Sequence, residues 1–177
     1  NDETFVGLFG FTSGATIQSV NLENIRVRGY MYVGGLVGWA ESTDITSVEV
    51  NKNVTNKETC TKDEYCVWAR FGQYGGGLAG YLYQGSNVSH VKTGGPVKGS
   101  GDTIGGVAGY INGSMLTNSS SSSRIDGGSE IGGIAGVISN STIDRVFATG
   151  NIYAKTDDDK VGSIAGGFAG SIIDSSV

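Results

Sequence analysis

The sequence predicts an all-β fold, a parallel β-solenoid of about six coils that forms one domain over residues 1–177. Three observations lead to this prediction: a high glycine content, a short apolar motif that recurs at a nearly constant period, and the lack of a sustained helical period. Glycine accounts for 31 of the 177 residues, about 18% against a usual ~7%. Because each glycine would destabilise a helix by up to ~1 kcal/mol, we expect strands.

The recurring motif is a six-residue block in which glycines flank apolar side chains. Its copies begin near residues 5, 33, 75, 104, 131 and 161 and read FVGLFG, VGGLVG, GGGLAG, IGGVAG, IGGIAG and VGSIAG. The final glycines of successive copies are 28, 42, 29, 27 and 30 residues apart. The period is therefore close to 28 residues, and each period corresponds to one predicted coil.

Each coil continues with two apolar residues three positions apart, followed by a weaker apolar segment. The pairs are Ile17 and Val20, Ile45 and Val48, Val88 and Val91, and Ile143 and Val146. Together with the motif, these segments predict three short strands per coil. Since a unit of this length cannot bury its apolar face alone, we expect the coils to stack and share a core.

Stacking would place equivalent residues of successive coils in columns. The fourth motif position forms a column of large aliphatic residues that we expect in the core: Leu8, Leu36, Leu78, Val107, Ile134 and Ile164. The flanking glycines allow bends and close approach of neighbouring coils. No helix and no suitably placed lysine follow these glycines, so we do not expect them to bind phosphate.

One period is about 14 residues longer than the others, which predicts an insertion loop at residues 51–74. This loop contains both cysteines of the chain, Cys60 and Cys66. Because no other Cys or His lies nearby, the pair is a poor metal site. We expect a disulfide, as in an extracellular protein, with two free thiols as the alternative.

The charge distribution excludes several partners. The net charge is −5, and no basic run exceeds two residues, so we expect neither nucleic acid nor an anionic membrane surface as a partner. The apolar stretches are far shorter than the ~20 residues that a membrane-spanning helix needs, and no basic and apolar leader opens the chain. We therefore expect no membrane insertion.

The blocks GLFG at 7–10, GLVG at 35–38 and GLAG at 77–80 resemble the GLUG-motif repeat family, named for Gly-Leu-apolar-Gly. The variants GVAG, GIAG and SIAG extend the resemblance over the chain outside the insertion. It implies a β-solenoid displayed on the cell surface or secreted, as in bacterial adhesins and in regions of IgA-cleaving peptidases. It implies no catalytic residues.

Five Asn-x-Ser/Thr sequons are candidate glycosylation sites: Asn53, Asn87, Asn112, Asn118 and Asn140. Three of them follow a motif glycine by a few residues, so we expect them near one corner of the rod, where solvent would reach them. The alternative is asparagine used in turns or stacked as a ladder. The segment 118–123, NSSSSS, is compatible with a strand, a loop or an O-glycosylated patch.

Phe11, Trp39, Tyr81 and Tyr110 form an aromatic column one residue after the final motif glycine. Such a column is a candidate platform for sugar rings or for a partner rod. The alternative is that the rings pack against one another or beneath a loop, and we expect Trp68, Phe71 and Tyr74 of the insertion to cover part of them.

The residues that carry catalysis are scarce. His90 is the only histidine and lacks a serine motif or a suitably spaced carboxylate, so we do not expect an enzyme or a cofactor. Asp157, Asp158 and Asp159 are weak calcium candidates, since consecutive carboxylates in a loop are more often a solvated turn.

We expect a non-catalytic structural or adhesive repeat protein outside the cell. The first motif copy already begins at residue 5, and the sequence ends within the sixth predicted coil without a charged cap. We therefore expect open coil ends, which would favour head-to-tail stacking. The predicted partners are neighbouring repeats or further copies of the chain, and glycans. The alternative is a carbohydrate-binding solenoid module.

Overall fold

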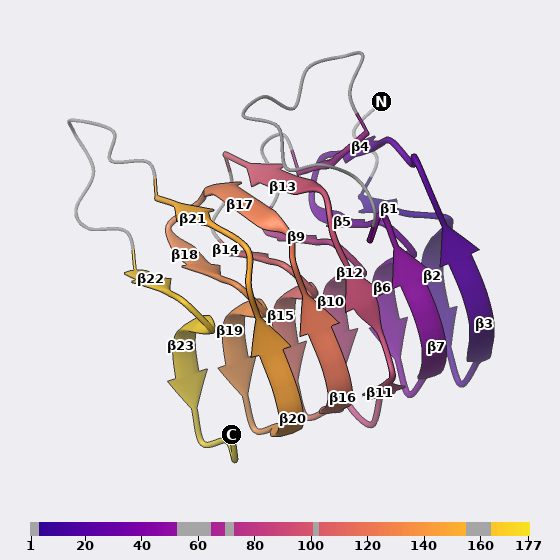
Figure 1. Cartoon of the computed structure of the whole chain (residues 1–177). Coiled ribbons are helices and arrows are strands. Elements are labelled where there is room, and N and C mark those ends of the chain that lie inside the picture. Colours follow the sequence, from indigo (N-terminus) through magenta and orange to yellow (C-terminus); the bar gives the residue numbers. More distant parts are fainter. Residues whose placement is uncertain (1–3, 53–64, 70–72, 101–102, 155–163) are drawn as a thin grey trace.

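The computed structural model describes residues 4–52, 65–69, 73–100, 103–154 and 164–177 (Figure 1). Every regular element in these ranges is a β-strand. All strand pairs are parallel. The prediction of an all-β chain is confirmed, and the parallel sheets are consistent with a parallel β-solenoid.

The strands form four sheets, in each of which a strand lies beside its counterpart from the next period. Sheet A consists of β1 (Phe5–Val6), β5 (Tyr32–Gly34), β9 (Tyr74–Gly76), β14 (Thr103–Gly105), β18 (Glu130–Gly132) and β22 (Ile164–Gly166). Sheet B consists of β2 (Phe9–Ser13), β6 (Val37–Glu41), β10 (Ala79–Tyr83), β15 (Ala108–Asn112), β19 (Ala135–Ser139) and β23 (Ala169–Ile173).

Sheet C contains the longest strands, and one of its positions is shared by two short ones. It consists of β3 (Thr16–Leu22), β7 (Asp44–Val50), β11 (Asn87–Ser89) with β12 (Lys92–Thr93), β16 (Met115–Ser121) and β20 (Thr142–Ala148). Sheet D consists of β4 (Val27–Gly29), β8 (Val67–Ala69), β13 (Pro96–Gly99), β17 (Arg124–Gly127) and β21 (Ile152–Tyr153). We call consecutive strands with one place in each sheet, such as β5 to β8, a rung.

The prediction of three strands per period is wrong, because each complete rung contributes to four sheets. The motif is a corner between two strands rather than one strand. In the second rung β5 ends at Gly34 and β6 begins at Val37, and Leu36 between them is fully buried. A Cβ on Gly34 would overlap the carbonyl oxygen of Val37 and lie 2.6 Å from the Cα of Ala79. Glycine is therefore required both by the bend and by the next rung.

The pairing also corrects the position of the last motif copy. Gly132 pairs with Gly166 and Ala135 with Ala169, so the sixth copy is residues 165–170, AGGFAG, rather than 161–166. The segment SIAGGFAG contains two overlapping candidates, and the period alone favours the earlier one. The observed register places two glycines in the tight corner, where the alternative would place a serine. Phe168 consequently takes the core position predicted for Ile164, which is 49% exposed.

Part of the range predicted as an insertion, residues 51–74, belongs to the sheets. Strand β8 lies inside that range, yet it pairs with both β4 and β13 and belongs to sheet D. Tyr74 likewise begins β9. Cys66 is fully buried next to β8, whereas Cys60 lies outside the described residues, so the disulfide stays a prediction.

The core lies inside the stacked rungs, in two clusters. The larger one packs sheet B and the corner residues against sheet C and includes Leu36, Leu78 and Ile134. The smaller one lies between sheets A and D. Leu8, which the sequence placed in the core, is 56% exposed, because it belongs to the first rung and has a neighbouring rung on one side only.

The strands of sheet C bend at one residue in each rung. The bend residues have positive φ angles of 47° to 56°, and they are Ser19, Ser47, His90, Asn118 and Arg145. In a regular strand, residues three positions apart point to opposite faces. The bend instead lets Ile45 and Val48 both point into the core, which explains the three-residue spacing of the apolar pairs.

Candidate functional site

The predicted aromatic column exists. Phe11, Trp39, Tyr81 and Tyr110 are paired in register across β2, β6, β10 and β15. A second aromatic column, formed by Phe5, Tyr32 and Tyr74 in sheet A, lies beside it. We call the two columns together the aromatic ladder.

The rings of the aromatic ladder cover one another. Tyr32 stacks on Tyr74 with ring centroids 5.2 Å apart, and Tyr74 stacks on Tyr81 at 5.4 Å, with interplanar angles of 17° and 14°. Trp39 meets Tyr81 edge to face at 4.8 Å. Because neighbouring rings occupy the faces that a sugar would stack on, this geometry supports the alternative in which the rings pack together.

Tyr81 is the most buried ring of the ladder, with 8% of its surface exposed. Its hydroxyl accepts a hydrogen bond from the side-chain amide of Asn112 at 3.2 Å. Burial raises the pKa of the Tyr81 phenol to about 12. The Nε1 atom of Trp39 is buried and finds no acceptor among the described residues.

The aromatic residues of the predicted insertion have different surroundings. Tyr74 packs in the aromatic ladder as expected. Trp68 instead lies in sheet D, where the guanidinium of Arg28 and the ammonium of Lys98 approach its ring at 4.8 and 5.6 Å. Phe71 lies outside the described residues.

Three sequons gather at the turns between sheets B and C, as the sequence predicted. Asn87 begins β11, Asn112 ends β15 and Asn140 follows β19. Asn87 and Asn140 are exposed, whereas Asn112 is half-buried against Tyr81. Asn118 is an exposed bend residue of sheet C and accepts a hydrogen bond from Arg145 Nε at 2.7 Å. Asn53 lies outside the described residues.

A column of hydroxyl side chains at the same turns was missed by the sequence analysis. Its members are Thr43, Ser86, Ser114, Ser141 and Ser175. The Oγ of Ser141 accepts a hydrogen bond from the backbone N–H of Ser114 at 3.2 Å and donates to the carbonyl oxygen of Ser139 at 2.6 Å. Each such residue ties one rung to the next. The available signal was a hydroxyl two positions before an apolar residue in five of the six periods, as in Thr43 before Ile45 and Ser141 before Ile143.

The outer face of sheet C carries a groove of about 500 Å³ at the bend. One wall is formed by the bend residues Ser19, Ser47, His90 and Asn118. The other wall is a column two residues further along each strand: Asn21, Glu49, Lys92, Ser120 and Phe147. We call this feature the sheet C groove.

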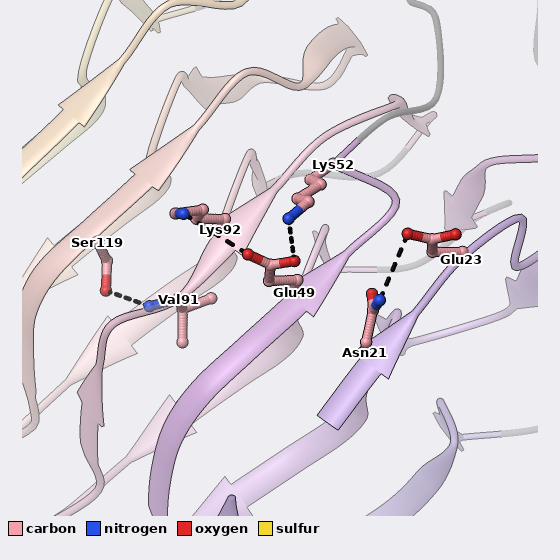
Figure 2. A network of polar contacts seen from close by, with 7 residues as sticks. All are labelled: Asn21, Glu23, Glu49, Lys52, Val91, Lys92 and Ser119. Atoms are coloured by element: carbon pink, nitrogen blue, oxygen red, sulfur yellow. Dashed lines mark hydrogen bonds and ion pairs between the residues drawn. The ribbon is translucent and has the colours of Figure 1, made fainter. Parts of the chain in front are cut away.

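Figure 2 shows the charged network in the second wall of the groove. Glu49 bridges two cations: Lys52 forms a close ion pair with it, and Lys92 Nζ lies 3.5 Å from Oε1. The hydrogen bond from Lys52 and the charges of both lysines, opposed by partial desolvation, lower the pKa of the Glu49 carboxyl. Deeper in the groove, the backbone N–H of Val91 donates to Ser119 Oγ at 3.0 Å.

His90 is exposed and lies between β11 and β12 in the first wall of the groove. The calcium candidates Asp157, Asp158 and Asp159 lie outside the described residues. Within the part of the chain that the structure describes, no group of three or more His, Cys, Asp or Glu side chains could hold a metal ion. None of the described residues belongs to a helix long and apolar enough to cross a membrane.

Comparisons of the chain with protein-family models, with curated proteins and with solved structures found no match. The fold and the geometry above therefore define the class of the chain, an all-β protein built from parallel sheets.

Proposed function

We propose that this chain is a parallel β-solenoid of six coils, of the GLUG-repeat type, that acts as a non-catalytic structural or adhesive rod outside the cell. It is a segment of a surface rod or a subunit of a head-to-tail fibre. The period near 28 residues, an insertion closed by the Cys60–Cys66 disulfide and glycans on the exposed sequons belong to this proposal.

The observation that carries the proposal is the exposure of apolar residues at both ends of the stack. At one end, Leu8 and Phe9 are 56% and 40% exposed, and at the other, Ile172 and Ile173 are 50% and 48% exposed. Interior residues of the same columns, such as Leu36, are fully buried.

The edge strands at the two ends are complementary. Strand β2 pairs only with β6, and β23 pairs only with β19, among the described strands. Since all pairing is parallel, the free edge of β23 has the polarity needed to receive the free edge of β2 from a further repeat. A contact of this kind repeats without closing and extends a rod or fibre.

Two further features support an extracellular location. Asn87 and Asn140 are exposed at one corner of the stack, where a glycan would not disturb the core. Cys66 is fully buried directly before β8, as expected for one half of a structural disulfide.

The experiment is to follow the assembly of the purified chain by sedimentation velocity and electron microscopy. We expect concentration-dependent end-to-end assemblies, and we expect the double variant Leu8→Lys and Ile172→Lys to abolish them because both ends become charged. Met115→Lys is the matched control, since Met115 is 42% exposed on the interior strand β16 and leaves both ends unchanged. Monodisperse wild-type chain at every concentration would contradict the proposal.

A further inference from the structure

The sheet C groove runs across the strands and therefore along the stacking direction. The residues of its walls come from β3, β7, β12, β16 and β20 and, in His90, from the segment that links β11 to β12. With neighbouring strands ~4.8 Å apart, five rungs give it a length of roughly 20 Å. A second hollow of about 250 Å³ shares Lys92, Ser120 and Phe147 with it and extends to Lys52. This shape suits an extended chain molecule rather than a compact ligand.

The groups in the walls match those of a polyhydroxylated ligand. Hydroxyls, as in Ser19 and Ser120, and amides, as in Asn21 and Asn118, both donate and accept hydrogen bonds, as sugar hydroxyls do. A ligand that spans several rungs meets a new set of these groups at each rung. An apolar ligand would leave them without partners, at a cost in free energy for each one.

Glu49, Lys52 and Lys92 together carry one positive charge, opposite in sign to the charge of the whole chain. Two lysines, Lys52 and Lys92, share a single carboxylate, that of Glu49. One ammonium charge in this network therefore has no counter-charge within it, although the chain carries a net charge of −5. The Lys92 side chain is 61% exposed, so an anionic group of a ligand can reach it.

Phe147 supplies a flat apolar surface at one end of the second wall. It is 60% exposed, and it has no ring partner among the described residues. This separates it from the aromatic ladder, in which neighbouring rings cover the faces. The C–H face of a pyranose ring can pack on such a side chain.

We propose that the sheet C groove binds an extended acidic oligosaccharide, with a carboxylate of the sugar at Lys92 and a pyranose ring against Phe147. This site is distinct from the aromatic ladder and from the ends of the stack. The proposal adds a ligand to the structural role and does not depend on end-to-end assembly.

The test uses tetragalacturonate as the probe and its fully methyl-esterified form as a neutral ligand of the same length and linkage. Isothermal titration of the purified chain should detect the acid, with an affinity that falls as salt is added. The affinity for the ester should be lower by a factor of about ten or more, as expected when one charge-assisted hydrogen bond is lost. Equal binding of the two forms, or binding of neither, would overturn the proposal.

Two pairs of variants locate the site. Lys92→Met should weaken binding of the acid about tenfold, whereas Lys98→Met makes the same charge change in sheet D and should leave it unchanged. Phe147→Ala should weaken binding, and Phe11→Ala, in the aromatic ladder, should not. Equal losses in both members of either pair would contradict the assignment to the groove. Failure of binding would leave the assembly experiment unaffected, so the two proposals fail separately.

Discussion

Tyr81 and Tyr110, which lie opposite each other on β10 and β15, stack with ring centroids 5.0 Å apart and planes 18° apart. This contact reports the register of two neighbouring rungs, because a slip by one residue would turn one ring to the other face of sheet B. The aromatic ladder is therefore part of the stack, and its ring contacts depend on the correct register between rungs.

The first prediction concerns high pH. The pKa of the Tyr81 phenol is raised by burial to about 12, against about 10 in an unfolded chain. The folded state thus holds this proton more tightly, and the resulting stability is present below pH ~10 and is lost as the pH rises through about 12. Denaturant unfolding should give a lower free energy of unfolding at pH 11 than at pH 9. In Tyr81→Phe this difference should be smaller. Tyr30→Phe, at a ring that is 40% exposed, should leave the loss unchanged.

The second prediction tests the corner glycines. A Cβ on Gly105 would overlap the carbonyl oxygen of Ala108 and lie 2.5 Å from the Cα of Ala135 in the next rung. Gly105→Ala should destabilise the fold by about 3 kcal/mol or more, measured by urea unfolding. At Gly167 a Cβ would meet nothing within 4 Å, and Gly167→Ala should be neutral. Similar losses in both variants would contradict the corner geometry.

The third prediction tests the hydroxyl column. Ser141→Ala removes the acceptor of the Ser114 N–H and the donor to the Ser139 carbonyl, both in buried surroundings. We expect a loss of about 1–3 kcal/mol in the free energy of unfolding. Ser13→Ala, at an exposed serine that ends β2, should change it by less than ~0.5 kcal/mol. If both variants have the same stability as wild type, the column does not hold the rungs together.

The fourth prediction separates interior from end residues. Leu78 is fully buried, so Leu78→Ala should cost about 2–5 kcal/mol. Leu8 occupies the corresponding corner of the first rung and is 56% exposed, so Leu8→Ala should cost much less in the dispersed chain. In end-to-end assemblies the loss at Leu8 should grow, because the contact buries it. Chemical denaturation below and above the assembly concentration measures both values.

The repeat pattern was sufficient to predict parallel strands and the core columns. Leu36, Leu78, Val107 and Ile134 are all fully buried, because glycine and aliphatic residues recur in phase and only stacking satisfies both. The position of the last motif copy was not predictable from the period. The period favours the earlier of two overlapping blocks, whereas the pairing of Gly166 with Gly132 and of Ala169 with Ala135 selects the later one.

The sheet C groove could not be predicted from residue types. Ser19, His90 and Arg145 share no side-chain chemistry, yet each occupies the bend with a positive φ angle. The sequence indicates the bend only through the three-residue spacing of the apolar pairs, such as Val88 and Val91. That spacing contradicts a regular strand and, in retrospect, reports a bend between the two residues.

The stacking of equivalent residues is tested most directly by distances between spin labels. Gln18 and Asp144 belong to one column of sheet C, and Arg28 and Tyr153 belong to one column of sheet D. Labels should be introduced as non-natural amino acids, so that both cysteines stay intact. Pulsed electron paramagnetic resonance should give a mean near 19 Å for each pair, four strand spacings of ~4.8 Å. A mean beyond roughly 30 Å for either pair would contradict the stack, since it exceeds six such spacings.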